Sequence, residues 1–197
     1  MKKKKITVFL GHPDKETKSG SFADAYEKGA RDAGHEVRRV NLGDLKFDPI
    51  LHKGYKVIQE IEPDLKAAQE AITWCDHLAV FYPSWWSTMP ALLKGFFDRA
   101  WIPGFAFRFK KEGFGAGYIW YRLMQGKSAR VFVMSDSHPL AARFIFGDTT
   151  NEIKRCLLWF AGFCPIRIKK VGPLKFANEA KLANWRKRFE KWGSKAA

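Results

Sequence analysis

Short runs of consecutive apolar residues alternate along the chain with longer segments whose apolar residues recur every three or four positions. The short runs predict buried strands. They lie at residues 6–10, 35–42, 78–82, 130–135 and 166–171. The longer segments predict helices at residues 21–33, 62–74, 91–101, 151–161 and 178–192. Gly34 and Gly162 follow two of them directly and are expected to end those helices.

Strands made of uninterrupted apolar residues and separated by helices are typical of a parallel sheet whose two faces are both covered. Five such units in 197 residues predict one domain, spanning residues 1–197, of the α/β class. We expect a three-layer, flavodoxin-like fold with a five-stranded parallel sheet in the order 2-1-3-4-5 and helices on both faces. In that order the loops after the first and third strands meet at the switch point, where ligands bind.

The loop after the third strand holds two adjacent tryptophans. It contains Ser84, Trp85, Trp86 and Ser87, and Thr88 is expected to cap the helix that follows. Tryptophans at the end of a buried strand need a flat or apolar group to lie against. Backbone N–H groups near a helix start also stabilise negative charge. The loop therefore predicts a planar cofactor with a polar edge, for which a flavin fits best; the alternative is a pair of core tryptophans.

The loop after the first strand, residues 11–22, is rich in serine and opens directly into a helix. Ser19 and Ser21 offer hydroxyl groups, and free N–H groups at a helix start attract phosphate. Ser21 alternatively does no more than cap the helix. His12 faces either the ligand or solvent. Because this loop and the tryptophan loop end at the same edge of the predicted sheet, we expect them to bind one ligand.

An aromatic segment follows the turn at residues 103–104. Phe105, Phe107 and Phe109 alternate with smaller or charged residues in a long connection. Such a segment is either a satellite core or a contact between subunits. An interface that also covers the cofactor explains the aromatic content best, and we expect Trp86, Phe107 and Phe109 to form walls of a substrate pocket.

Charge and cysteine content narrow the classes of function that this sequence can serve. The net charge is +15, which attracts anions in general, a nicotinamide dinucleotide among them. No basic patch with interleaved aromatics predicts nucleic-acid binding, so none is expected. Three cysteines without metal-ligand spacing predict neither a disulfide framework nor a metal site. The first apolar run is too short for a signal peptide and no run approaches the roughly 18 residues of a membrane span, so we expect a cytoplasmic protein.

A longer pattern resembles a known family. The string Tyr82-Pro-Ser-Trp-Trp-Ser-Thr-Met-Pro-Ala-Leu-Leu-Lys-Gly-Phe-Phe-Asp-Arg99, followed by Gly104-Phe-Ala-Phe107, is similar to the NAD(P)H quinone dehydrogenases, a flavodoxin-like family that includes DT-diaphorase. Further similarity lies at residues 12–13, 21–22, 33–37, 47–49 and 160–163.

The resemblance implies site residues at matching positions. Ser19, Ser21 and Phe22 match the loop that holds the flavin phosphate. Ser84, Trp85, Trp86 and Ser87 match the loop along the isoalloxazine ring. Ser135, Asp136, Ser137 and His138 match the loop at the flavin's polar edge. Phe107 and Phe109 match aromatic positions that reach across a homodimer to the neighbouring site.

The chain departs from the family at three places. The loop at residues 135–139 lacks the usual glycines, Ala23 replaces a common asparagine, and Phe146 stands where the mammalian enzymes place a histidine that assists hydride transfer. The flavin itself carries the hydride chemistry, so flavin reduction is expected to survive these changes. The expectation that the acceptor is a quinone depends more strongly on the residues that differ here.

The sequence therefore predicts a homodimeric, flavin-dependent NAD(P)H oxidoreductase that passes two electrons to a quinone-like acceptor. FMN is favoured over FAD because the chain is short and offers no additional segment for an adenine. His138 is either a proton donor or a solvated histidine. Two alternatives stay open: a flavodoxin-type electron carrier, although such carriers are typically acidic, and an accessory regulatory subunit of a membrane transport protein.

Overall fold

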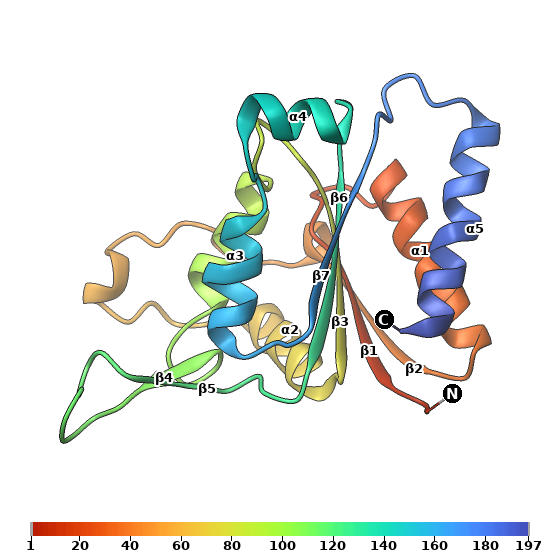
Figure 1. The fold of residues 1–197 in the computed structure, drawn as a ribbon. Coiled ribbons are helices and arrows are strands. Elements are labelled where there is room, and N and C mark those ends of the chain that lie inside the picture. The colour runs from red at the N-terminus through yellow and green to blue at the C-terminus, as the bar shows by residue number, and fades with distance from the viewer. Residues whose placement is uncertain (1, 197) are drawn as a thin grey trace.

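Five parallel strands build the central sheet in the order β2-β1-β3-β6-β7 (Figure 1). The computed structural model describes residues 2–196. The strands are β1 (Lys5–Leu10), β2 (Glu36–Asn41), β3 (His77–Pro83), β6 (Ser128–Met134) and β7 (Ile166–Val171). All four neighbouring pairs are parallel. With the strands of a small separate hairpin set aside, this is the predicted order 2-1-3-4-5, and the fold prediction is confirmed.

Helices cover both faces of the sheet (Figure 1). Within residues 2–196 the α-helices are α1 (Lys18–Asp32), α2 (Pro63–Trp74), α3 (Ala91–Ala100), α4 (Pro139–Phe146) and α5 (Glu179–Lys195). α1 and α5 lie on one face, where Phe22 stacks on Phe189 with ring centroids 4.8 Å apart. α2, α3 and a π-helical segment, Glu152–Trp159, pack on the other. None of these helices, within residues 2–196, combines the length and apolarity needed to cross a membrane.

The start of α1 differs from the expectation. The helix begins at Lys18, three residues earlier than expected, because Thr17 is its N-cap and its Oγ1 accepts the Gly20 N–H at 3.2 Å. Ser21 lies inside the first turn and does not cap the helix. Gly34 ends α1 as expected: it adopts φ +80°, a conformation that suits glycine, and its N–H donates to the Arg31 carbonyl.

Two elements were not predicted. α4 carries four exposed apolar side chains, Leu140, Phe144, Ile145 and Phe146. Its apolar residues therefore do not show the spacing of a helix with one buried face. β4 (Phe107–Phe109) and β5 (Trp120–Arg122) form an antiparallel hairpin of three-residue strands, too short to show an alternating pattern. In Figure 1, α4 lies over the ends of β3 and β6, whereas the hairpin lies at the opposite end of the sheet.

Candidate functional site

The loops after β1, β3 and β6 enclose a first cavity of about 340 Å³. His12 and Trp85 connect two of these loops, with ring centroids 5.4 Å apart in an edge-to-face arrangement. The cavity is lined by His12, Thr17, Lys18, Ser19, Pro83, Ser84, Trp85, Met134, Ser135, Asp136, Ser137 and Leu174. The structure thus brings together, in one space, residues from all three loops that the sequence analysis singled out.

A second cavity of about 600 Å³ adjoins the first. The two share Ser84, Ser135 and Ser137 in their linings. The second cavity is lined in addition by Trp86, Ser87, Val133, Pro139, Ala142, Phe146, Thr149 and Lys170. Its walls combine apolar surface with hydroxyl groups, and Lys170 is the single charged residue on them. Together the cavities form a site with two chemically different ends.

The first cavity is suited to an anion. The start of α1 opens onto it through Lys18 and Ser19, whose backbone N–H groups have no hydrogen-bond partner among residues 2–196. The Lys18 ammonium donates to the Leu174 carbonyl at 2.6 Å, which holds it at the cavity wall. A Cβ atom at Gly20 would meet the Lys15 carbonyl oxygen at 1.9 Å, so the loop can approach the helix this closely only because Gly20 has no side chain.

The tryptophan loop is a tight turn with an uncommon backbone. Trp85 and Thr88 exchange backbone hydrogen bonds, both of 3.0 Å, and the two residues between them have positive φ: +50° at Trp86 and +65° at Ser87. Such a turn normally uses glycine or asparagine, and side chains at these angles are strained. The Trp85 N–H is therefore occupied, while the N–H groups of Trp86 and Ser87 have no partner in the described part of the chain.

The sequence expectation for this loop needs one correction. Thr88 does not cap α3, because Pro90 occupies the N-cap and the Thr88 hydroxyl donates to Glu152 instead. The side chain of Trp86 is fully exposed, which argues against the alternative of a core tryptophan at this position. The loop presents its free N–H groups through turn geometry, not through the start of α3.

His12 is held in one orientation. Its Nδ1 accepts the Asp14 N–H at 2.8 Å. Partial burial lowers the pKa of His12, although the hydrogen bond and the negative charge of Asp14 counteract this in part. Near neutral pH the ring is therefore uncharged, and Nε2 carries the proton. His12 presents a hydrogen-bond donor at the cavity, not a charge.

Several predicted site residues lie outside the two cavities. Phe22 is buried in the core against Phe189. His138 is exposed. Phe107 and Phe109 belong to the hairpin at the other end of the sheet, where Phe107 packs edge-to-face against Phe160.

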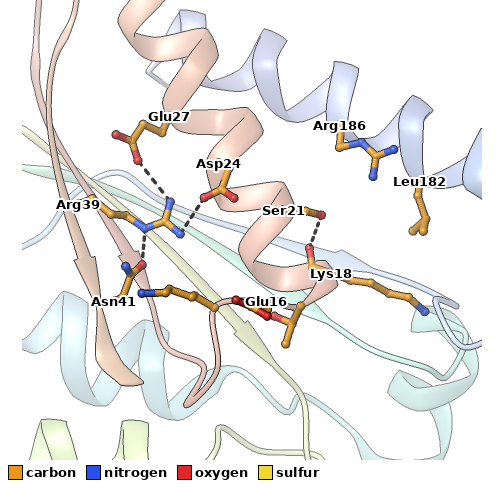
Figure 2. A pocket seen from close by; sticks show the side chains of 11 residues that line it. Glu16, Lys18, Ser21, Asp24, Glu27, Arg39, Asn41, Leu182 and Arg186 are labelled. Atoms are coloured by element: carbon orange, nitrogen blue, oxygen red, sulfur yellow. Dashed lines mark hydrogen bonds and ion pairs between the residues drawn. The ribbon is translucent and has the colours of Figure 1, made fainter. Parts of the chain in front are cut away.

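Ser21 points into a surface hollow beside α1 that shares Thr17 and Lys18 with the first cavity (Figure 2). Its hydroxyl donates to the Lys18 carbonyl at 3.1 Å. In this hollow Arg39 forms ion pairs with Asp24 and Glu27, at 3.2 and 3.4 Å. Arg39 is therefore paired, whereas Lys18, which lines both this hollow and the first cavity, forms no ion pair among residues 2–196.

Sequence reasoning missed Thr17, Lys18, Thr149 and Lys170 as residues of the site. A capping pattern one turn earlier than Ser21 was the available signal for Thr17 and Lys18. Lys170 is the next-to-last residue of β7, and its side chain points to the same face as Ile166 and Ile168. That alternation was visible, but nothing in the sequence placed this strand end beside the tryptophan loop.

Comparisons with known proteins agree with the architecture. The family model described as a flavodoxin-like fold matches residues 4–195. An uncharacterised NAD(P)H oxidoreductase of Escherichia coli K12 is 27% identical over 112 residues, which cover 54% of this chain and 57% of that protein. The NAD(P)H dehydrogenase [quinone] 1 of Cavia porcellus is 25% identical over 127 residues, covering 54% of this chain and 46% of that protein.

A solved structure with a similar fold is the NAD(P)H:quinone oxidoreductase from Methanothermobacter marburgensis. It superposes with a TM-score of 0.80 and 20% sequence identity, and each chain is covered completely. At that identity the likeness extends to the fold alone. The chain spans only about half of the length of the curated relatives that it matches.

Proposed function

Because this chain belongs to the flavodoxin-like fold family, we propose that it is a flavin-dependent NAD(P)H oxidoreductase. In the proposed reaction two electrons pass from a nicotinamide cofactor, through a bound flavin, to a quinone or a similar aromatic acceptor. The observation that carries the proposal is the pair of adjoining cavities, since one is suited to a phosphate and the other to a flat ring. Relatives named as an NAD(P)H oxidoreductase and as NAD(P)H dehydrogenase [quinone] 1 support it.

The first cavity fits the phosphate and the sugar chain of a flavin. The unpartnered N–H groups of Lys18 and Ser19 and the Lys18 ammonium are donors of the kind that bind phosphate at a helix start. Asp136 is the only carboxylate on this lining, and it is suited to the hydroxyl groups of the sugar chain rather than to the phosphate. His12 adds a neutral donor.

The second cavity fits the ring. When bound, a flavin accepts a hydride from NAD(P)H and gains negative charge on the pyrimidine edge of its ring. The free N–H groups of Trp86 and Ser87 are fixed by the turn, so they stabilise such charge without reorganising. Pro139, Ala142 and Phe146 supply apolar surface beside them. His138 lines neither cavity, and we assign no proton transfer to it.

We propose FMN as the cofactor, with FAD as the alternative. One relative is named an FMN-dependent NADH:quinone oxidoreductase, which supports FMN. We place the protein in the cytoplasm and expect no nucleic acid among its partners, as the sequence predicts.

We further propose a homodimer. Phe107 and Phe109 lie far from the cavities of their own chain, at the other end of the sheet (Figure 1). They form walls of a substrate pocket, together with Trp86, only if a second copy brings its hairpin to the site.

The absorption spectrum of the purified protein tests the cofactor directly. We expect bands near those of free flavin, a released chromophore with the mass of FMN, and bleaching on anaerobic addition of NADH or NADPH without an auxiliary reductase. A protein that is colourless and cannot be reconstituted with FMN or FAD would overturn the proposal. Bound flavin that NAD(P)H does not reduce would instead favour an electron carrier.

A further inference from the structure

The second cavity contains a cation that none of the expectations above used. We propose that Lys170 faces the pyrimidine edge of the bound flavin and stabilises the negative charge which a hydride brings to the ring. This inference rests on the proposed function. Without Lys170, only the backbone N–H groups of Trp86 and Ser87 would stabilise this charge in the second cavity.

The position of Lys170 follows from strand register. Lys170 pairs with Val133 of β6, and both residues line the second cavity together with Trp86 and Ser87. Its side chain is half-buried, which reduces screening by water. The Nζ atom donates one hydrogen bond, to Thr149 Oγ1 at 3.0 Å. An ammonium group has three protons, so two remain for a ligand.

Among residues 2–196, no carboxylate forms an ion pair with Lys170, since none of their carboxylate oxygens lies within 4.0 Å of its Nζ atom. Asp148, whose charge interacts with that of Lys170, accepts hydrogen bonds from the hydroxyl and the N–H of Thr150. These bonds are the main reason that the pKa of Asp148 lies below its usual range, and the charges of Lys170 and Arg143 contribute less.

The rest of the lining explains why this cation matters. Apart from Lys170, the second cavity presents hydroxyl groups and apolar or aromatic side chains, Phe146 among them. Phe146 provides neither a charge nor a hydrogen-bond donor. A fixed positive charge beside the ring would therefore come from Lys170 alone among the lining residues, and such a charge changes the reduction potential of a flavin.

The experiment compares Lys170→Met with Lys169→Met in the FMN-loaded protein. Lys169 is the preceding residue of the same strand, exposed on its other face, and serves as the matched control. The readouts are the dissociation constant of sulfite, which adds to oxidised flavin and leaves negative charge on the ring, and the two-electron midpoint potential. We expect Lys170→Met to weaken sulfite binding roughly tenfold and to lower the potential by the equivalent of about 30 mV. Lys169→Met should change neither.

Lys170→Arg keeps the charge and should restore both values to within a few-fold of the wild type. If Lys170→Met fails to retain FMN while Lys170→Arg retains it, and both melt at the temperature of the wild type, the inference is also supported. Equal sulfite affinity and equal potential in Lys170→Met and the wild type would overturn it. Failure of the wild type to bind any flavin is a different result, because it removes the proposed function itself.

Discussion

His77 shows how burial alone can set the protonation state of a residue. It lies in β3, its Nδ1 is 2.8 Å from Ser128 Oγ, and its Nε2 is buried without a hydrogen-bond partner among the described residues. Burial lowers the pKa of His77 to about 3, and the positive charges of Lys4, Arg130 and Arg167 act in the same direction. A histidine so placed remains neutral in the folded protein under all mild conditions.

The pKa of His77 predicts a loss of stability in acid. Below the unfolded value of 6.5, the unfolded chain binds a proton that the folded protein cannot accept until the pH reaches about 3. The free energy of unfolding should therefore fall as the pH decreases from 6.5 towards 3, with a contribution from this residue of about 1.4 kcal/mol per pH unit. Denaturant unfolding of His77→Gln at several pH values should show a slope that is smaller by this amount.

Wild-type protein, unfolded by denaturant at the same pH values, is the reference for that series. A slope that is the same in His77→Gln and in the wild type would mean that His77 accepts its proton in the folded state.

At the scale of elements, the sequence predicts whatever depends on local apolar periodicity. β7 has the predicted bounds, and β1, β3 and α3 agree to within a residue or so. The convergence of the first and third loops was predictable because strand order determines which strand ends are neighbours.

The remaining elements depend on contacts that no local pattern records. α4 leaves its apolar side chains exposed, and the hairpin is held by aromatic stacking between Trp120 and Phe160, 40 residues apart in the chain. Lys170 reaches the site through the pairing of β7 with β6. Side chains brought together by tertiary structure in this way leave little trace in a single sequence.

The cap of α1 provides a prediction about an element that also forms part of the site. Thr17→Ala removes the hydrogen bond to the Gly20 N–H and should lower the free energy of unfolding by about 1 kcal/mol. It should also weaken FMN binding, because the same turn orients the N–H groups of Lys18 and Ser19. Denaturant unfolding and a fluorescence titration with FMN measure the two effects.

Ser21→Ala is the matched comparison for this helix. The Ser21 hydroxyl donates to the Lys18 carbonyl, so the free energy of unfolding should change by no more than about 0.5 kcal/mol and FMN affinity should stay intact. A larger loss of stability in Ser21→Ala than in Thr17→Ala would contradict the assignment of the cap.

On the scale of the whole molecule, the separation between the hairpin and the cavities decides how a complete site is formed. Within one chain, Phe107 and Phe109 lie at the end of the sheet opposite to α4 (Figure 1). The hairpin region also exposes Phe114 and Tyr118, at 94% and 86%. The proposed homodimer would cover these side chains with a surface of the second copy. In the proposed homodimer, a site uses the cofactor loops of one chain and the hairpin of the other.

Mixed dimers test this arrangement. One variant, Phe107→Ala with Phe109→Ala, should bind flavin but turn over slowly. A second variant, Lys18→Glu with Ser19→Asp, should not bind flavin, because added negative charge at the start of α1 repels the phosphate.

After subunit exchange at equal concentrations, half of the dimers are mixed, and each mixed dimer has one site with intact loops and an intact hairpin. Activity should therefore rise to about a quarter of the wild-type value, whereas each variant alone stays near its own low rate. A hairpin that served its own chain would give no recovery, since neither chain then holds both parts, and a monomeric protein in light scattering would exclude the shared site outright.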